Sequence, residues 1–234
     1  STTFSGVGFQ PDMTWLKSRD QTESWLQADS VRGGGENLQS NSTGAEYTDS
    51  NRFTDFTSDG FTLGSYDGIN ESDDNLISYN WKAGGAPTAD NDNTSGAMDA
   101  NSVALDGSLQ SSYSPSGSPS IYPKKMSINT TSGFSIIEYT GNDASSATVP
   151  HGLGVAPELV IYKCMSAASH DWIVYNKTIT AAKRLKLNTT DAEDTSSSQF
   201  DDTEPTSTVV TIGTFNNINQ ASQDYIAYCF ASIE

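Results

Sequence analysis

Short runs in which apolar and polar positions alternate recur along most of the chain. The clearest are Leu76–Trp81 and Tyr225–Phe230, which alternate with a period of two. Shorter runs rich in β-branched and aromatic residues lie at 13–16, 61–63, 159–162 and 209–212. Because a period of two is that of a strand, the pattern predicts short β-strands about ten residues apart, separated by Gly, Asn, Asp and Ser turns. Helical periodicity is weak, and we expect at most single turns, over 23–27 and 178–183.

The chain contains one sequence unit twice. GVGFQPDMTWLKS (6–18) aligns with GLGVAPELVIYKC (152–164), so that two glycines, a proline and a lysine coincide. Further segments match in the same order: 24–26 with 171–173, 38–46 with 185–193, 59–70 with 207–219, and 74–83 with 223–232. Chance gives any one of these matches, but not all of them in one order. The sequence therefore predicts one structural unit in two tandem copies.

The segment between the copies has a different composition. Residues 84–120 are rich in Gly, Ser, Pro, Asn and Asp, which favour turns and an extended path. We therefore divide the chain into a first β repeat (1–83), an irregular linker with short strands (84–132) and a second β repeat (133–234). The expected fold is all-β, with antiparallel β-sandwich or jelly-roll-like units. Whether the copies make one sandwich or two stays open.

Composition narrows the function classes. Asp and Glu number 29 against 12 Lys and Arg, a net charge of −17, and Ser and Thr make up about a quarter of the chain. An acidic chain repels phosphate backbones, so nucleic-acid binding is not expected. No apolar run has the length of a membrane helix, so we expect no membrane insertion. Cys164 and Cys229 lie within apolar runs, which favours buried thiols and leaves a disulfide as the alternative.

Candidate catalytic residues are few. His151 lies in a Pro-His-Gly turn, where we expect it to bond to the backbone, and His170 lies in a loop. No GxSxG motif surrounds a serine. Acidic pairs such as Asp73-Asp74 and Asp201-Asp202 occur in loops, where solvated carboxylates are the simpler interpretation. The sequence therefore assigns no catalytic residue and predicts a protein that is not an enzyme, with a polysaccharide depolymerase as the less favoured alternative.

Loop residues supply weak binding candidates. Asp67, Asp73 and Asp74 lie in a loop whose side chains offer oxygen ligands, so they are candidate ligands of a calcium ion. No other cofactor is expected. Four tyrosines in polar loops are candidates for stacking on a sugar ring: Tyr47, Tyr66, Tyr113 and Tyr122. Residues that coincide in the two copies are read as structural. Among them, Trp25 and Trp172 are expected to anchor cores, and Lys17 and Lys163 to mark strand exits to solvent.

A family resemblance adds an expected function. TVPHGLGVAPELVIYK (148–163) and DYIAYCFA (224–231), with SGFSIIEYTGN (132–142) before them, resemble a repeated β-domain of tail-fibre and other virion proteins of marine bacteriophages. That family of uncharacterised function carries no reaction. The resemblance implies a lectin-like β-domain displayed on the surface of an extracellular virion.

The resemblance also implies partners. They are other virion proteins and a host-surface glycan, and a homotrimer is expected in a fibre. The resulting hypothesis is a tail-fibre or appendage protein that contributes to host attachment. The alternative is a capsid-decorating or fibre-building subunit without a receptor of its own.

Overall fold

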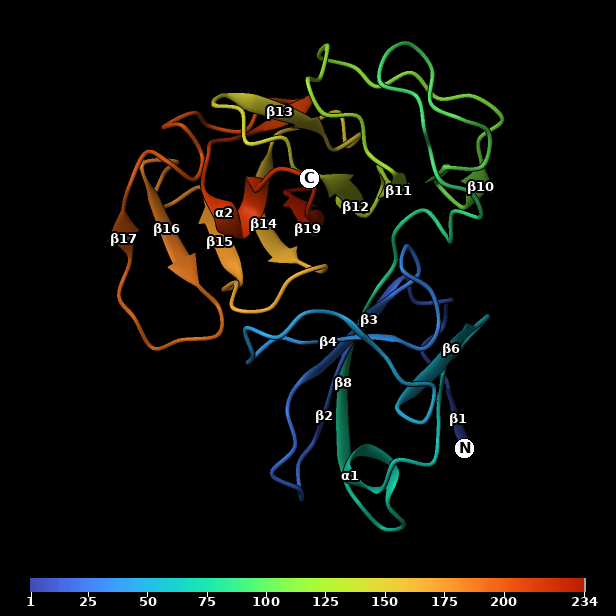
Figure 1. The fold of residues 1–234 in the computed structure, drawn as a ribbon. Coiled ribbons are helices and arrows are strands. Elements are labelled where there is room, and N and C mark those ends of the chain that lie inside the picture. The colour runs from blue at the N-terminus through green and yellow to red at the C-terminus, as the bar shows by residue number, and fades with distance from the viewer. Residues whose placement is uncertain (234) are drawn as a thin grey trace.

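The computed structural model describes residues 1–233. The N-terminal part of the chain forms a sandwich of two β-sheets. This first sandwich contains β1 (Thr2–Ser5), β2 (Met13–Ser18), β3 (Leu26–Asp29), β4 (Glu36–Gln39), β5 (Tyr47–Thr48), β6 (Phe53–Thr57), β7 (Gly60–Leu63), α1 (Asp67–Asn70) and β8 (Leu76–Trp81). The larger sheet has the order β5-β4-β3-β2-β8, and the smaller one has the order β1-β7-β6. Figure 1 shows this unit in the lower half of the view.

The second sandwich repeats this plan and enlarges it. It contains β9 (Val103–Leu105), β10 (Ser108–Leu109), β11 (Lys125–Asn129), β12 (Phe134–Thr140), β13 (Ala147–Pro150), β14 (Pro157–Cys164), β15 (Ile173–Asn176), β16 (Lys183–Lys186), β17 (Asp194–Thr195), β18 (Val209–Ile212), α2 (Asn216–Asn219) and β19 (Asp224–Ala231). Its large sheet has the order β10-β9-β11-β12-β19-β14-β15-β16-β17, and β13 pairs with β18. All the named pairs are antiparallel except β9 with β11, among residues 1–233.

Strand order and side-chain bonds both confirm the repeat. The order β5-β4-β3-β2-β8 corresponds to β17-β16-β15-β14-β19, and the pair β1-β7 corresponds to β13-β18. The backbone N–H of Trp25 donates to Asn41 Oδ1 (3.0 Å), and that of Trp172 donates to Asn188 Oδ1 (2.8 Å). The same side chain thus closes the same loop in both copies. The all-β fold with two tandem sandwich units is therefore confirmed.

Three apolar cores separate four layers of sheet. Leu16, Leu26 and Phe53 belong to the core of the first sandwich, and Val160 and Tyr225 belong to that of the second. A third core lies between the two large sheets. It is formed by Met13, Val31, Leu38, Ala83, Phe134, Ile136, Met165, Trp172, Ile226 and Tyr228. The repeats are therefore two sandwiches packed face to face, which the sequence left open.

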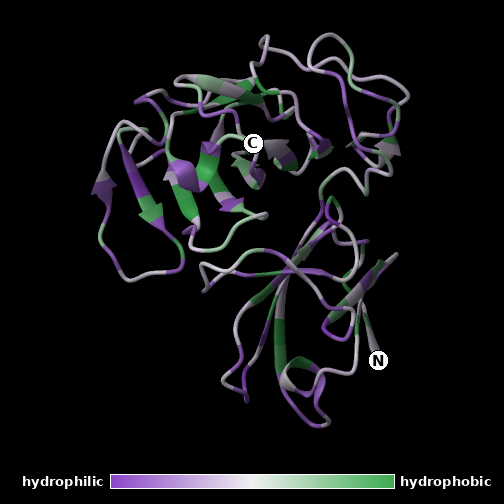
Figure 2. Cartoon of the chain, viewed as in Figure 1, coloured by the Kyte–Doolittle hydropathy of each residue, from purple (hydrophilic) through white to green (hydrophobic). Residues whose placement is uncertain are grey.

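Alternation along β19 explains how one strand serves two cores. Tyr225, Ala227 and Cys229 face the second sandwich's own core, whereas Ile226 and Tyr228 face the first sandwich. Because every second side chain points to the opposite face, a strand buried on both sides is apolar at nearly every position. In Figure 2 green is accordingly concentrated on strands in the middle of the second sandwich, whereas the loops are mostly white to purple.

Hydrogen bonds between backbone and side-chain groups hold the junction between the sandwiches. After β8 the chain passes close to β11, where the Gly84 N–H donates to Ser127 Oγ (2.9 Å) and Asn129 Nδ2 donates to the Ala83 carbonyl (3.2 Å). A Cβ on Gly84 would meet the backbone N of Ile128 at 2.6 Å, so only glycine fits. This close approach continues the first sandwich directly into the second.

Several local expectations were wrong. Neither 23–27 nor 178–183 is helical; the helical turns are α1 and α2, at equivalent places before β8 and β19. Lys163 does not reach solvent: it is fully buried, and its Nζ donates to the His170 carbonyl (2.7 Å). Burial lowers the pKa of Lys163 to about 8. Periodicity places a residue on a face, but it does not say what covers that face.

Both cysteines are free and buried. Cys164 and Cys229 belong to the core of the second sandwich. This outcome agrees with the interpretation of two apolar thiols, and the alternative of a disulfide between them is not realised in the structure.

His151 is a buried turn residue that makes the stability of the fold depend on pH. The Leu153 N–H donates to its Nδ1 (3.2 Å), so its Nε2 donates to the Thr206 carbonyl (3.1 Å). Burial lowers the pKa of His151 from 6.5 to about 4. The unfolded chain therefore takes up a proton at a higher pH than the folded chain. This group alone is expected to reduce the free energy of unfolding by about 3 kcal/mol from pH 7 to pH 4.

Urea unfolding of the wild type and of His151→Gln, followed by circular dichroism between pH 7 and pH 4, measures this dependence. We expect the variant to lose markedly less stability on acidification than the wild type. His170→Gln, at a residue on a loop, is the control and is expected to keep the wild-type slope. Equal slopes for the wild type and His151→Gln would contradict the prediction.

Candidate binding site

The structure brings two of the four candidate tyrosines together. The guanidinium of Arg52 lies over the ring of Tyr66 at 3.7 Å and near that of Tyr47 at 5.8 Å. The Tyr66 hydroxyl also donates to Glu23 Oε1 (2.9 Å). Since the Arg52 guanidinium covers one face of the Tyr66 ring, that face is not free to stack on a sugar.

The other two candidate tyrosines lie apart in the second sandwich. Tyr113 packs against its core and forms an isolated β-bridge with Met98. Tyr122 is half-buried in a shallow polar groove of about 350 Å³. Asn91 and Asn93 line that groove, but their amides are occupied with the loop backbone, since Asn91 Nδ2 donates to the Asn93 and Pro123 carbonyls. Tyr122 is thus the one of these four rings that lies in a groove with polar neighbours.

The candidate calcium ligands do not converge. Asp67 opens α1, Asp73 occupies a left-handed backbone position, and Asp74 accepts hydrogen bonds from Ser18 Oγ and Gln21 Nε2. Among residues 1–233, no three His, Cys, Asp or Glu side chains form a group that could hold a metal ion. These three acids therefore do not make up a shared coordination site in this structure.

A cluster of aromatic rings lies on the outer face of the first sandwich's large sheet. Antiparallel pairing of β2 with β8 sets Trp15 opposite Tyr79 and Met13 opposite Trp81. Trp25 stands immediately before β3, which pairs with the other edge of β2. Because Trp15 and Tyr79 are register partners, their side chains leave the sheet on the same face. Four rings from three segments thereby meet, and we call this set, Trp15, Trp25, Tyr79 and Trp81, the aromatic face.

Ring geometry shows that the aromatic face is continuous. The centroid of Trp15 lies 5.7 Å from that of Trp25 and 6.5 Å from that of Trp81. Tyr79 lies 6.3 Å from Trp25 and 6.2 Å from Trp81. Trp81 in turn contacts Phe230 of the second sandwich. The aromatic face therefore extends the core between the two large sheets out toward solvent.

The rings of the aromatic face are accessible. Tyr79 is 48% exposed and is one of five large hydrophobic residues exposed among residues 1–233. Trp15, Trp25 and Trp81 are half-buried. Apolar surface that a soluble protein leaves exposed in one contiguous area marks a binding surface more often than isolated exposed residues do.

Polar groups border the aromatic face. Trp15 Nε1 donates to Ser40 Oγ (2.8 Å), and Asn41 Nδ2 donates to Ser24 Oγ (3.3 Å). Lys17, on the same strand face as Trp15, directs its Nζ to the carbonyls of Ser18 and Gln21. The indole of Trp15 is thus fixed by a hydrogen bond, so its ring does not need to be ordered when a ligand binds.

The same face of the second sandwich is closed. Trp172 and Tyr228 occupy the positions of Trp25 and Tyr79, and both are fully buried. Trp172 Nε1 donates to the Gln39 carbonyl of the first sandwich (3.0 Å), and the Tyr228 hydroxyl donates to Asp29 Oδ2 (2.6 Å). The first sandwich covers this face of the second, so among residues 1–233 an accessible aromatic face exists in the first repeat and not in the second.

Sequence reasoning missed the aromatic face because it looked for sugar-stacking rings in polar loops and not on strands, and it treated Trp25 as a core anchor. A usable signal was present: three of the four tryptophans lie in the first repeat, and Trp15 and Trp81 align with Ile161 and Phe230 in the second. When one copy has more tryptophans on its strands than the other, the two copies differ at the surface that these side chains form.

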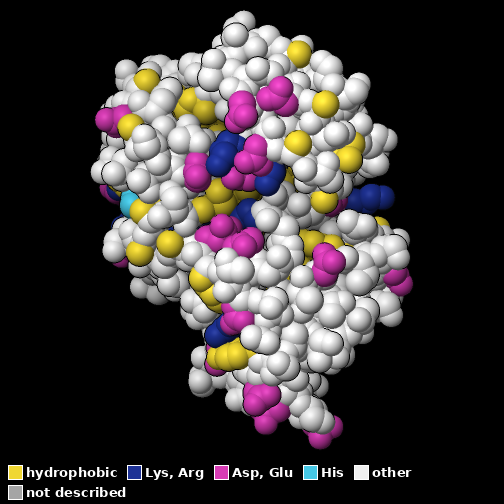
Figure 3. Space-filling model, turned by 45° about the vertical axis from the view of Figure 1, so that its right-hand side comes forward, with side chains coloured by type: hydrophobic (Ala, Val, Ile, Leu, Met, Phe, Trp, Pro, Cys, Tyr) yellow, Lys and Arg dark blue, Asp and Glu magenta, His cyan; other side chains and the backbone are white. Residues whose placement is uncertain are grey.

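Charges gather elsewhere on the molecule. In Figure 3, acidic and basic side chains lie together in the middle of the face, at the level where the two sandwiches meet, with apolar atoms among them. At this junction Arg32 Nε contacts Asp29 Oδ2 at 2.6 Å, and Arg32 Nη1 contacts Glu46 Oε2 at 3.0 Å. The Arg32 and Asp29 side chains are almost completely buried, so this ion pair joins the repeats from the interior and is distinct from the surface charges that Figure 3 shows.

Comparison with known proteins gives one match. The model of a family described as a domain of unknown function, DUF7483, matches residues 1–114 and 117–234. Neither the curated proteins nor the solved structures yield a match. Among the residues described, no helix is long and apolar enough to span a membrane. The chain therefore belongs to the DUF7483 family and contains its domain in two tandem copies.

Proposed function

We propose that this protein is a non-enzymatic attachment protein of a bacteriophage particle, and that its aromatic face binds a glycan of the host surface. The observation that carries the proposal is the exposed, contiguous arrangement of the Trp15, Trp25 and Tyr79 rings. Aromatic rings pack against the apolar faces of sugar rings, and neighbouring amides and hydroxyls bond to sugar hydroxyls. Asn41 and Ser24 supply polar groups beside Trp25, since the Trp25 N–H donates to Asn41 Oδ1 and Asn41 Nδ2 donates to Ser24 Oγ.

The overall charge indicates which glycans fit. A chain of net charge −17 repels acidic polysaccharides over long distances. Lys17 is the one basic residue on the strands of the aromatic face, and its ammonium is engaged by backbone carbonyls. The proposed ligand is therefore an uncharged glycan that is bound by ring stacking and hydrogen bonds.

A binding assay with neutral host-surface polysaccharides tests the proposal. Three of the four tryptophans belong to the aromatic face, so binding is expected to change the intrinsic tryptophan fluorescence. Trp25→Ala and Tyr79→Ala are each expected to weaken binding at least tenfold, equivalent to about 1.4 kcal/mol, because they remove a stacking ring. Tyr79→Phe keeps the ring and is expected to bind nearly as well as the wild type.

Tyr122→Ala is the matched control. It removes a half-buried ring from the polar groove of the second sandwich, far from the aromatic face in sequence, and is expected to leave binding unchanged. Binding that is lost in Tyr122→Ala and kept in Trp25→Ala would move the site to that groove. Absence of binding to any host-surface component would contradict the proposed attachment function.

A further inference from the structure

The two large sheets pack on each other with an offset. In the first sandwich, the register partners Met13 and Asp29 are both buried at the junction with the second sandwich. Their equivalents in the second sandwich, Leu159 and Asn176, are register partners as well, but both are only half-buried. The same row of the repeated sheet is therefore covered in one copy and partly accessible in the other.

This accessible row of the second sandwich is apolar over two neighbouring strands. Phe230 on β19 is the register partner of Leu159 on β14, so both side chains leave the sheet on the same face. Tyr228, two residues before Phe230, lies on that face too and belongs to the core between the large sheets. Phe230 packs against Phe134 at a centroid distance of 4.7 Å and is half-buried. We call Phe230, Leu159 and Asn176 the second-repeat row.

The second-repeat row is continuous with the aromatic face. The ring centroid of Phe230 lies 6.2 Å from that of Trp81, and the two rings meet edge to face at 72°. Trp81 lies 6.5 Å from Trp15, which in turn lies 5.7 Å from Trp25. The three tryptophans stand on β8, on β2 and directly before β3, which are neighbouring strands, so this line of rings crosses the sheet. A ligand that follows the line passes from one sandwich to the other.

Polar groups accompany the apolar ones at both ends of this line. In the second-repeat row the side chain of Asn176 is held in place, because its Oδ1 accepts the Thr178 N–H (2.9 Å). At the other end, Asn41 Oδ1 accepts the Trp25 N–H (3.0 Å). Amide groups next to exposed apolar side chains are the combination that binds both the hydroxyls and the apolar faces of sugars.

The two surfaces are fixed relative to each other. Trp172 Nε1 of the second sandwich donates to the Gln39 carbonyl of the first (3.0 Å), and the Tyr228 hydroxyl donates to Asp29 Oδ2 (2.6 Å). The core between the large sheets joins the sandwiches over the same area. A ligand that touches both surfaces therefore does not have to order two separate units when it binds.

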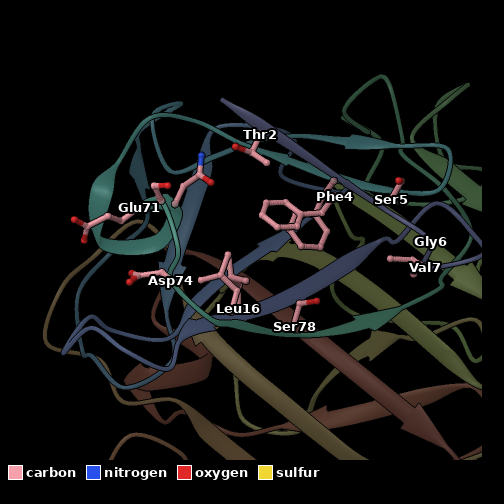
Figure 4. Close-up of a pocket in the computed structure, with 13 residues that line it drawn as sticks. Thr2, Phe4, Ser5, Gly6, Val7, Leu16, Glu71, Asp74 and Ser78 are labelled. Carbon is pink, nitrogen blue, oxygen red and sulfur yellow. The ribbon is translucent and has the colours of Figure 1, made fainter.

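The sheet itself separates this line of rings from a pocket inside the first sandwich. The pocket has a volume of about 650 Å³, and Figure 4 shows Leu16 and Ser78 beside it. Leu16 follows Trp15 along β2, and Ser78 precedes Tyr79 along β8. Because successive side chains leave a strand on opposite faces, the pocket and the aromatic face lie on opposite sides of the sheet. The pocket is therefore not part of the surface that spans the two repeats.

We propose that the glycan of the aromatic face is bound as an extended segment of several sugar units, which crosses from the first sandwich to the second and stacks on Phe230; this step rests on the glycan-binding function proposed above. Stacking sets one sugar ring on one aromatic ring, so a single sugar does not reach along the line from Trp25 to Phe230. Phe230 and Leu159 of the second repeat are then specificity-determining residues, because they favour long chains over short fragments.

Disaccharide and hexasaccharide fragments of one neutral polysaccharide that binds the wild type are the probes, titrated against tryptophan fluorescence. We expect the wild type to bind the hexasaccharide about tenfold more tightly than the disaccharide. Phe230→Leu removes the ring and keeps an apolar side chain. It is expected to weaken hexasaccharide binding about fivefold and to leave disaccharide binding unchanged, because the aromatic face holds the disaccharide. Phe230→Tyr keeps the ring and is expected to bind both fragments as the wild type does.

Leu159→Ala and Leu109→Ala form a matched pair. Leu109 is 44% exposed on β10, and three strands of the same sheet separate β10 from β19. We expect Leu159→Ala to weaken hexasaccharide binding and Leu109→Ala to bind it as the wild type does. Circular dichroism of each variant checks that the fold is retained.

The outcomes separate this inference from the proposed function. Equal affinities of the wild type for the two fragments, or wild-type hexasaccharide binding in Phe230→Leu, would overturn the extended site across both repeats. If Trp25→Ala loses binding in that case, the aromatic face still binds the glycan, but by itself. Absence of binding of the wild type to any neutral polysaccharide would overturn both the extended site and the proposed function.

Discussion

We expect replacement of Arg32 by methionine to lower the free energy of unfolding by about 3–5 kcal/mol. Arg32 and Asp29 form an ion pair (2.6 Å) whose side chains are 2% and 0% exposed. Asp29 also accepts the Tyr228 hydroxyl, so the pair links the first sandwich to the second. Without the guanidinium, a buried carboxylate loses its counter-charge, and that loss costs more than an intact pair contributes.

Urea unfolding followed by circular dichroism at pH 7 measures this effect. Arg19→Met is the matched control, because Arg19 is exposed and forms no ion pair with the described residues; we expect it to change stability by less than about 0.5 kcal/mol. Tyr228→Phe removes one donor to Asp29 and is expected to cost less than Arg32→Met. A loss below about 1 kcal/mol in Arg32→Met would show that the junction does not depend on this pair.

The second large effect is expected for Trp172→Ala, at about 3–5 kcal/mol. Trp172 is fully buried between the two large sheets, and its indole N–H bonds to the first sandwich. Its removal leaves a cavity in the core that joins the repeats. Trp25→Ala changes the equivalent residue of the first repeat, but that ring is half-buried, so a loss of no more than about 1.5 kcal/mol is expected.

Trp172→Ala and Trp25→Ala serve as controls for each other, because both remove a tryptophan side chain from the equivalent position of the repeated fold. Circular dichroism is the suitable readout because each variant loses a fluorophore. Equal losses in Trp172→Ala and Trp25→Ala would contradict the assignment of Trp172 to a core and of Trp25 to a partly accessible surface.

Strand periodicity and the internal match were sufficient to predict an all-β chain with two tandem units. They did not predict the helical turns, because the four residues of α1 and α2 are too few to show a period. They also did not identify the proposed binding site. Tyr47 and Tyr66 were selected because they lie in polar loops, yet the structure sets both rings against Arg52. The aromatic face was missed because Trp15, Trp25 and Tyr79 meet only through strand pairing.

The sequence by itself determined the local structure of both copies, since strand runs, turn residues and the asparagines that close the loops depend on neighbours along the chain. It also determined that these units resemble each other. Only the tertiary structure decided what covers each face. Trp25 and Trp172 stand at the same position, but packing of the first sheet on the second buries one and leaves the other accessible. A strand has two faces and two edges, and which of them stay open depends on residues far away in the sequence.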